Sequence, residues 1–394
     1  MKILYLTFYF EPDLGPCSLR NTSLSKMLSK YLNNTDHIDV LTTFPHRYCS
    51  YEKNDIPYYE NNDNLHIYRI NVSSHRNGYF GQIVAFLRYF LCVIKKTKKN
   101  DYDLIFASSS KLLTAYLGYY IAHKINKPLY IDIRDIFYEN IQNIINNKII
   151  KYVVLQLIKK IENVVFNYAR HINLISEGFV SYFEIYKCKS FSFFSHGIDD
   201  DFLQLRRSER STKNDKYKII YAGNIGEGQG LENIIPSAAE LLQDNYSFAV
   251  FGDGGTKAKL QREIKKRNLL NVEINDPIDR KKLKEVYCDA DFLFIHLNNY
   301  WAFKKVLPSK IFELAAYDKP IIAGVTGFSY HFIEKYIPNV ILFESCDLKD
   351  MIKKLKSYSY KNEYRTQFVK HFQRDIINVQ MAHSIISVAL PEGS

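Results

Sequence analysis

Short apolar runs alternate with longer segments of helical spacing along almost the whole chain. The runs are rich in Ile, Val, Leu, Tyr and Phe, which favour strands, while the longer segments repeat apolar positions every three to four residues. The pattern predicts strands at Lys2–Phe8, His37–Thr43, Leu65–Ile70, Asp103–Ser108, Pro128–Ile133, His171–Ile175, Lys218–Ala222, Ser247–Phe251, Asn271–Ile274, Asp291–His296, Pro320–Ala323 and Val340–Phe343. Helices are predicted at Leu19–Leu32, Lys111–Ile125, Leu231–Leu242 and Thr256–Asn268.

Because strands and helices alternate, each half of the chain is expected to form a doubly wound parallel sheet. The halves are separated by Ser195–Lys216, a polar segment without periodicity. We therefore predict an α/β protein of two Rossmann-like domains, 1–195 and 196–394, that face each other across a cleft. Packing of the last helix back onto the first domain is left as an alternative.

The composition narrows the class of partner. A length of 394 residues suits two domains, and a net charge of +11 favours an anionic partner such as a phosphorylated substrate, an anionic lipid or a nucleic acid. The basic residues are spread out, without zinc-finger spacing or an RNA-recognition signature, so we expect no nucleic-acid partner. Six cysteines without CxxC pairs indicate free thiols in a reducing compartment. With no signal-peptide layout and no window of ~20 apolar residues, a cytoplasmic protein is expected.

Glycine-rich turns in the second half are the first candidate site. YAGNIGEGQGLENI and FGDGG each follow a predicted strand and precede a helix, and DPIDRKKL follows a third strand. Such turns let the backbone approach a ligand closely and present N–H groups and a helix dipole to an anion. Gly226, Gly252 and Gly254 are therefore candidate phosphate-binding positions. Tight packing turns without a ligand are the alternative.

The segment VLPSKIFELAAYDKPIIAG adds charge to these turns. Pro308 suits the first turn of a helix, which leaves the amides of Ser309 and Lys310 available to phosphate oxygens. Lys310 supplies a positive charge, and Glu313, one turn further on, can accept hydrogen bonds from a ribose diol. A solvated Lys310–Glu313 pair is the alternative.

The first half offers a second set of candidates. Gly15 lies in the loop after the first strand, and Arg20 follows on the first turn of the next helix. Arg134 and Asp135 lie where another strand ends, so the Arg can clamp a phosphate while the Asp orients a hydroxyl or holds the Arg. An internal Arg–Asp pair is the alternative.

No metal site is predicted. The DxD pairs Asp101/Asp103 and Asp289/Asp291 precede their strands and so lie at the amino ends, away from the ligand edge of a parallel sheet. No His/Cys cluster has metal-ligand spacing.

One helix bears on membrane binding. Tyr79–Asn100 combines many aromatic residues with Lys95, Lys96, Lys98 and Lys99, and Tyr138–Arg170 is similar. Such a helix can lie in a lipid headgroup layer. A core-facing helix with a basic C-terminus explains the pattern equally well, and both interpretations stay open.

These residues resemble the GT-B glycosyltransferases of family 4, and more closely the O-antigen and capsule transferases of the N-acetylfucosamine-transferase type. The resemblance covers nearly the whole chain, through FYFEPDLGPCSLR, DIRDIF, SEGF, HGID, YAGNIGEGQGL, FGDGG and AFKKVLPSKIFE. It implies a retaining, metal-independent transfer of a sugar from a nucleotide diphosphate. The donor would bind the C-terminal domain, and a saccharide on a polyprenyl diphosphate would bind the N-terminal domain.

The resemblance also assigns residues. Glu313 matches the second Glu of the family's E-x7-E motif, Gly15 matches the loop glycine near the donor phosphates, and Arg134 occupies a position where many members have His. The chain departs from the broad pattern at Lys305, in place of the first Glu, and at two positions that usually carry an Arg and a Lys. Those two positions are Asn224 and Gln229, and cations that can compensate for them are Lys304, Lys305, Lys310, Arg20 and Arg134.

The resulting hypothesis is transfer of an N-acetylated deoxyhexosamine from a UDP-sugar to a lipid-linked acceptor in lipopolysaccharide, O-antigen or capsule synthesis, on the inner face of a bacterial cytoplasmic membrane. Predicted catalytic residues are Arg134, Asp135, Lys305 and Glu313. Predicted donor ligands are Gly15, Asn224, Gly226, Gln229, Gly252, Gly254, Ile278, Ser309, Lys310 and Glu313; Arg20 and Arg134 are predicted to bind the acceptor. The alternatives are a nucleotide-sugar epimerase of the same fold and a catalytically silent, UDP-binding scaffold.

Overall fold

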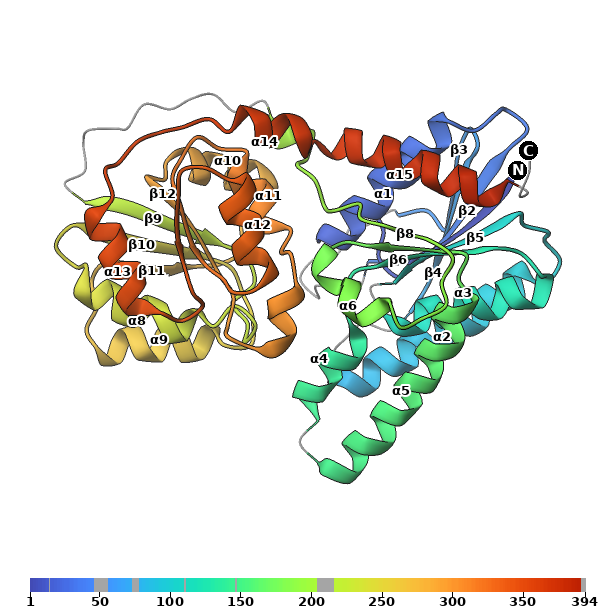
Figure 1. Ribbon diagram of the computed structural model, residues 1–394, viewed down its shortest axis with the longest axis horizontal. Coiled ribbons are helices and arrows are strands. Elements are labelled where there is room, and N and C mark those ends of the chain that lie inside the picture. Colours follow the sequence, from blue (N-terminus) through green and yellow to red (C-terminus); the bar gives the residue numbers. More distant parts are fainter. Residues whose placement is uncertain are drawn as a thin grey trace. The chain divides into compact units, whose positions relative to one another are not determined.

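The computed structural model describes residues 1–13, 15–45, 56–72, 78–109, 111–145, 147–203 and 216–390 (Figure 1). The chain divides into two units. Unit 1 comprises Met1–His196 and Asp375–Ser394, and unit 2 comprises Gly197–Arg374. The predicted boundary lay one residue earlier, and the last helix belongs to unit 1. Residues 204–215 of the predicted linker lie outside the described residues.

Unit 1 is built on a sheet with the strand order β3-β4-β2-β1-β5-β6-β7-β8. Its strands are β1 (Lys2–Leu6), β2 (His37–Thr43), β3 (Tyr59–Asn62), β4 (Leu65–Ile70), β5 (Leu104–Ser109), β6 (Leu129–Ile133), β7 (His171–Leu174) and β8 (Phe191–Ser192). All neighbours pair in parallel except β3, which runs antiparallel to β4. The central strands are almost continuously apolar because helices cover both faces of the sheet.

The helices of unit 1 form two layers (Figure 1). They are α1 (Pro16–Lys30), α2 (Gly78–Thr97), α3 (Leu112–Ile125), α4 (Phe137–Ile144), α5 (Lys148–Tyr168), η2 (Glu177–Phe179), α6 (Val180–Phe183) and α15 (Arg374–Ala389). Helices α1 and α15 cover one face, where Leu24, Leu28, Met381 and Ile385 join the buried side chains of β1 and β2 in one core cluster. Helices α2, α3 and α5 cover the other face.

Unit 2 is a wholly parallel sheet with the order β11-β10-β9-β12-β13-β14. Its strands are β9 (Tyr217–Ala222), β10 (Tyr246–Phe251), β11 (Val272–Asn275), β12 (Phe292–His296), β13 (Ile321–Gly324) and β14 (Val340–Phe343). Its helices are α7 (Asp200–Leu203), α8 (Leu231–Leu241), α9 (Lys257–Lys266), α10 (Arg280–Cys288), η3 (Trp301–Lys305), α11 (Lys310–Ala315), α12 (Phe328–Tyr336), α13 (Leu348–Ser357) and α14 (Thr366–His371).

In both sheets the strand order reverses beside the first strand. The reversal falls between β1 and β5 in unit 1 and between β9 and β12 in unit 2. At such a point the loops on either side diverge at the carboxyl edge, which is where doubly wound sheets bind ligands. The predicted α/β class with two Rossmann-like domains is confirmed, while β3 and β8 were not predicted. No helix among the described residues has the length and apolar character that a membrane span requires.

Candidate functional site

The glycine-rich turns after β9 and β10 touch each other through their backbones at the carboxyl edge of unit 2. A Cβ atom on residue 252 would lie 1.8 Å from the carbonyl oxygen of Gly223, and one on residue 254 would lie 2.5 Å from that of Ile225. Hydrogen bonds from Gly223 N to Phe251 O (2.9 Å) and from Ile225 N to Asp253 O (2.8 Å) hold the turns in this contact. Gly252 and Gly254 have φ values of 153° and 155°, which favour glycine. A ligand that approaches Gly252 and Gly254 therefore meets backbone atoms.

Asn224 and Gln229 lie together on the first of these turns. The Asn224 side chain is exposed, and its Nδ2 donates to Gln229 Oε1 at 2.7 Å. A Cβ atom on residue 226 would lie 2.5 Å from Asn224 Nδ2, so Gly226 leaves room for this pair. Where the resemblance led us to expect an Arg and a Lys, the chain has two neutral amides that bond to each other. This pair of amides can donate hydrogen bonds to a diphosphate but adds no positive charge.

His296 holds the same turn through hydrogen bonds, and it was not singled out from the sequence. Its Nδ1 lies 2.6 Å from Gln229 O, and its Nε2 accepts the N–H of Cys346 at 3.0 Å. Burial lowers the pKa of His296 to about 4, so the ring is neutral and its Nδ1–H donates to the Gln229 carbonyl. His296 is the last residue of β12, and a polar residue at a strand's carboxyl end is the signal that would have found it.

The PSK segment brings Lys310 and Glu313 to the same edge. Ser309 is the N-cap of α11 and Lys310 is its first residue. A Cβ atom on residue 223 would lie 2.9 Å from Lys310 Cε, so the lysine stem packs against the β9 turn. The Lys310 Nζ is 3.9 Å from Glu313 Oε1, and the two side chains are only 22% and 23% exposed. This half-buried pair is not the fully solvated pair considered from the sequence.

Glu313 has an unused acceptor atom. Its Oε1 is buried and has no hydrogen-bond partner among the described residues. A buried acceptor without a donor is costly, so a hydroxyl donor from a ligand would stabilise it. The buried Tyr287 hydroxyl neighbours the same carboxylate: burial first, and then the charge of Glu313, hold the Tyr287 pKa well above its ordinary value. Tyr287, also missed from the sequence, acts as a positioning residue for Glu313.

Two further predicted site residues, Lys305 and Ile278, lie on other segments of unit 2. Lys305 is half-buried at the end of η3. The carbonyl oxygen of the preceding residue, Lys304, packs closely against Gly327, because a Cβ atom on residue 327 would lie only 2.2 Å from it. Ile278 lies half-buried in the loop between β11 and α10. Within the part of the chain that the structure describes, no hydrogen bond or ion pair joins Ile278 to the other predicted donor residues.

The structure corrects the prediction for Arg20. This residue is 1% exposed, and its Nε and Nη2 donate to the two oxygens of Asp132, each at 3.2 Å. Its Nη1 donates to Ser195 O, and Nη2 also donates to Phe194 O at 2.8 Å. With its donors occupied inside unit 1, Arg20 is an internal strut, so we withdraw it as an acceptor ligand and as a compensating cation.

Asp132, at the end of β6, was not singled out from the sequence. Burial alone would raise its pKa, but the charges of Arg20 and Arg134 and a 2.6 Å hydrogen bond from Asn173 Nδ2 outweigh burial and keep the pKa below its ordinary value. Asp132 therefore stays ionised as the centre of a buried cluster.

Arg134 and Asp135 follow Asp132 at the carboxyl edge of unit 1. Arg134 is 5% exposed; its Nε is 3.4 Å from Asp132 Oδ2, and its Nη2 donates to Asn21 Oδ1 at 2.7 Å. The carboxylate that holds Arg134 is thus Asp132, and not Asp135 as the sequence suggested. The Nη1 of Arg134 is buried without a hydrogen-bond partner among the described residues. Gly15, the N-cap of α1 with φ 137°, begins the helix at this same edge.

Asp135 itself is exposed.

One aspartate of each DxD pair accepts a backbone hydrogen bond at the amino end of its sheet, where both pairs were expected to lie. Asp103 Oδ2 accepts the backbone N–H of Lys2 at 2.8 Å, and Asp291 Oδ2 accepts that of Lys218 at 2.8 Å. Each carboxylate therefore joins the amino ends of neighbouring strands, opposite to the edge that carries the glycine-rich turns.

Comparisons with known proteins agree with this geometry. Residues 204–374 match the family model "Glycosyl transferases group 1". WcaI of Escherichia coli (strain K12), whose name assigns it to glycosyl transfer in colanic acid biosynthesis, is 33% identical over 123 residues. That alignment spans 31% of this chain and 30% of WcaI.

Two solved structures share the fold over nearly their whole length. Sucrose-phosphate synthase from Thermosynechococcus elongatus superposes with a TM-score of 0.70 at 13% identity, covering 98% of this chain and 99% of the other. Anabaena HepE in complex with UDP-glucose superposes with a TM-score of 0.66 at 14% identity, covering 98% and 100%.

Proposed function

We propose that the protein is a glycosyltransferase that uses a nucleoside diphosphate sugar, because residues 204–374 match the family model of the glycosyl transferases group 1. One observation carries the proposal: two backbone-lined turns, a lysine and a carboxylate with an unused acceptor atom meet at the carboxyl edge of unit 2. These groups match the three parts of such a donor, namely an anionic diphosphate, a ribose diol and a sugar.

We assign the diphosphate to the glycine-rich turns and the start of α11. Backbone N–H groups at a helix N-terminus favour an anion, and Lys310 adds a positive charge against Gly223. The ribose hydroxyls would donate to Glu313 Oε1, whose burial makes that bond more favourable than it would be in water. HepE, which has the same fold, was solved with UDP-glucose, and this supports a uridine donor here.

The neutral Asn224–Gln229 pair requires a different source of positive charge. A charge-assisted hydrogen bond is roughly twice as strong as a neutral one, so the amides alone do not replace an Arg and a Lys. We assign the compensation to Lys310 and to Lys305, which stands where the resemblance expects a carboxylate. The positive charges of these two lysines would stabilise the negative charge of a departing diphosphate.

We further propose a retaining transfer in which lysines, rather than a metal ion, neutralise the leaving group. The acceptor oxygen forms a bond to the anomeric carbon on the face from which the bond to the phosphate oxygen breaks, and the departing phosphate takes the acceptor's proton. At the carboxyl edge of unit 1, the buried Nη1 of Arg134 has no hydrogen-bond acceptor among the described residues. A substrate oxygen can therefore accept a hydrogen bond from Arg134. We place Arg134 and Asp135 on the acceptor side of the reaction.

For the substrate pair we propose an N-acetylated deoxyhexosamine donor and a saccharide on a polyprenyl diphosphate. The similarity to WcaI supports a role in the synthesis of a surface polysaccharide such as lipopolysaccharide, O-antigen or capsule. A lipid-linked acceptor requires the protein to work at a membrane, and we propose the inner face of the cytoplasmic membrane.

The outer faces of α2 and α5 support membrane binding. Helix α2 buries Phe86, Tyr89 and Val93 against the sheet, so it is a core-facing helix; its opposite face is nevertheless apolar and exposed. The exposed apolar side chains of the two helices include Ile83, Val84, Leu87 and Leu91 on α2 and Ile149, Ile150, Tyr152, Val153, Leu157 and Val164 on α5.

The charges of these two helices have one sign at the surface. Helix α2 contains no acidic residue, and the single carboxylate of α5, Glu162, is 1% exposed. Exposed basic residues on both helices include Arg88, Lys95, Lys148 and Lys160. Helix α3 lies between them, with ring contacts from Tyr116 to α2 and from Tyr119 to α5. An apolar surface fringed only by cations suits an anionic bilayer.

The proposal is tested by UDP release from a panel of UDP-N-acetylhexosamines, with and without a short-chain polyprenyl-diphosphate-linked acceptor and with EDTA present. The wild type should release UDP in an acceptor-dependent manner. Glu313→Ala should raise the donor KM and lower kcat/KM, because it removes a group that holds the ribose. Glu334→Ala, an exposed Glu in the same unit, is the matched control. An unchanged kcat/KM in Glu313→Ala would remove Glu313 from the site.

The Asn224–Gln229 pair also favours a second candidate, a silent scaffold that binds UDP without turnover. Measurable UDP binding combined with no release from any donor, with or without acceptor, would support it over the transferase.

A further inference from the structure

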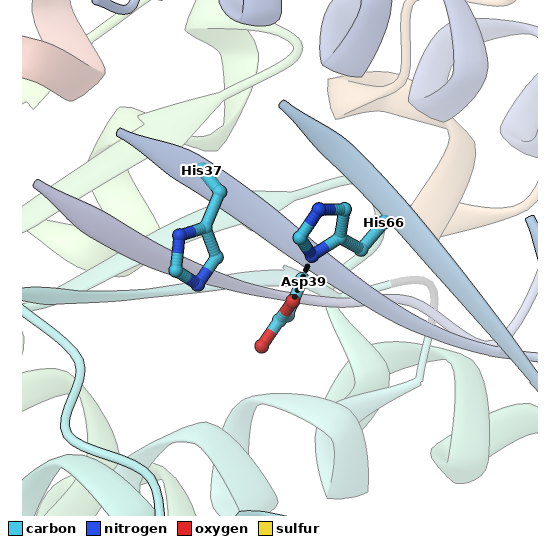
Figure 2. A group of neighbouring side chains, drawn as sticks. All are labelled: His37, Asp39 and His66. Carbon is cyan, nitrogen blue, oxygen red and sulfur yellow. Dashed lines mark hydrogen bonds and ion pairs between the residues drawn. The ribbon is translucent and has the colours of Figure 1, made fainter. Parts of the chain in front are cut away.

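Three potential metal ligands meet on one face of the unit 1 sheet. His37 and Asp39 are two residues apart on β2 and therefore point to the same face, and Asp39 lies directly opposite His66 of β4 in the parallel register. Figure 2 shows the two imidazole rings and the carboxylate converging from these neighbouring strands. One ligand atom from each residue lies within 4.8 Å of the others. Strand register, rather than spacing in the sequence, assembles this group.

The geometry is close to that of a metal centre. Tetrahedral Zn²⁺ with bonds of about 2.0–2.2 Å places its ligand atoms roughly 3.3–3.5 Å apart. His66 Nδ1 and Asp39 Oδ1 are already 3.2 Å apart. His37 is half-buried at the start of β2, and its ring stacks on that of His66 with the ring centroids 5.1 Å apart.

The surroundings of Asp39 orient its carboxylate. Its second oxygen, Oδ2, accepts a 2.8 Å hydrogen bond from the Tyr102 hydroxyl. Metal-ligating carboxylates are commonly held in this way by an outer hydrogen bond, which leaves the other oxygen aimed at the metal. Asp39 is buried while both imidazoles are half-buried, so solvent can supply an ion and a fourth ligand.

The positive charges of Lys2 and of the Met1 amino group act on His37 and oppose the binding of a cation. The amino group of Met1 lies close to this end of the sheet, but it is paired with Asp36. A further cation, Lys96, is held at the face of the Tyr68 ring, with its Nζ 3.6 Å from the ring centre.

The ligand types indicate which metal the site would bind. Two imidazoles and one carboxylate are a donor set for borderline transition ions, whereas Ca²⁺ and Mg²⁺ require mainly oxygen ligands.

We propose that His37, Asp39 and His66 bind one divalent transition-metal ion of the Zn²⁺ type, with water in the remaining position. The ion joins β2 to β4 at their amino ends. The phosphate-binding candidates of unit 1, Gly15 and Arg134, lie at the opposite edge of the same sheet. The ion therefore lies away from these candidates, and its presence is independent of the proposed metal-free transfer.

The test is equilibrium dialysis of the tag-free, EDTA-treated full chain against Zn²⁺, with metal content measured by elemental analysis. We expect one ion per chain, and at least a tenfold loss of affinity in His37→Gln and in His66→Gln. The matched control is His123→Gln, which removes an exposed histidine of α3 in the same unit. It should bind as the wild type does.

A second measurement guards against misfolding and against cysteine ligation. Zn²⁺ should raise the Tm of the wild type and of His123→Gln but not that of the two site variants, whose Tm in EDTA should equal the wild-type value. Co²⁺ should give d–d bands without a thiolate charge-transfer band, because all three ligands offer N or O. Absence of stoichiometric binding at micromolar Zn²⁺, or equal affinity in all four proteins, would overturn the proposal.

Discussion

Replacing Gly252 by alanine tests the backbone contact that builds the donor site. The added Cβ would lie 1.8 Å from Gly223 O, 3.0 Å from Gly223 C and 3.3 Å from Ile225 Cγ1. A carbonyl oxygen cannot rotate away as a side chain does, so the β9 and β10 turns must separate by more than an ångström. That separation breaks the hydrogen bonds that join the turns, such as Gly223 N to Phe251 O.

The expected cost has two parts. Overpacking a tight contact costs about 1–3 kcal/mol, and a non-glycine residue at φ 153° adds strain on the order of 1–3 kcal/mol. A combined loss of roughly 2–6 kcal/mol corresponds to a Tm decrease of about 5–20 °C for a domain of this size. Because the displaced turn also carries the phosphate-binding amides, the Kd for UDP should rise at least tenfold, or about 1.4 kcal/mol.

Gly255→Ala is the matched control. It lies in the same turn, yet a Cβ atom there meets nothing within 4 Å. Alanine at a compatible position tends to stabilise by about 0.4–1 kcal/mol through the unfolded state. Calorimetric unfolding and isothermal titration with UDP on both variants decide the matter. If Gly252→Ala melts and binds UDP like Gly255→Ala, the turns do not form the contact described, and the donor site must be assigned elsewhere.

Two further predictions concern unit 1. Burial raises the pKa of Glu162 to about 7, so between about pH 4.5 and 7 the folded chain keeps a proton that an unfolded Glu has lost. The free energy of unfolding should therefore fall by roughly 3 kcal/mol as pH rises through that window. Glu162→Gln should reduce the dependence of Tm on pH between pH 5 and 8, whereas the exposed Glu177→Gln should not. On anionic vesicles, the wild type should bind and be released by salt, and charge reversal of Lys95, Lys96, Lys98 and Lys99 should abolish binding. Leu157→Asp should weaken binding, while Leu270→Asp, at a 98% exposed position of unit 2, should leave it unchanged; full binding by Leu157→Asp would contradict the α2–α5 surface.

The strands were predictable because fully buried parallel strands leave an unmistakable apolar run between helices. Strand β3 escaped because Tyr59–Asn62 is polar and is ordered by antiparallel pairing with β4, which no local pattern reveals. Gly252 and Gly254 could be placed at a ligand edge since glycine-rich turns after strands carry that meaning wherever the sheet is parallel.

Partners distant in sequence could not be predicted. Arg20 follows a loop at a ligand-binding edge, so the sequence made it a candidate ligand. The strand order β1-β5-β6 brings Asp132 beside it, and the two residues form a buried ion pair. The same limit explains His37 and His66, which are joined by strand register, and His296, whose two partners come from different loops.

The position of α15 governs the order in which the chain can fold during synthesis. Its side chains Met381, Ala382, Ile385 and Val388 complete the core cluster of unit 1, yet they are made after all of unit 2. As the chain leaves the ribosome, Gly197–Arg374 can finish its own sheet first. Until α15 has been made, the apolar faces of α1 and β1 that it covers stay exposed to solvent. The core of unit 1 can therefore close only after α15 has been made.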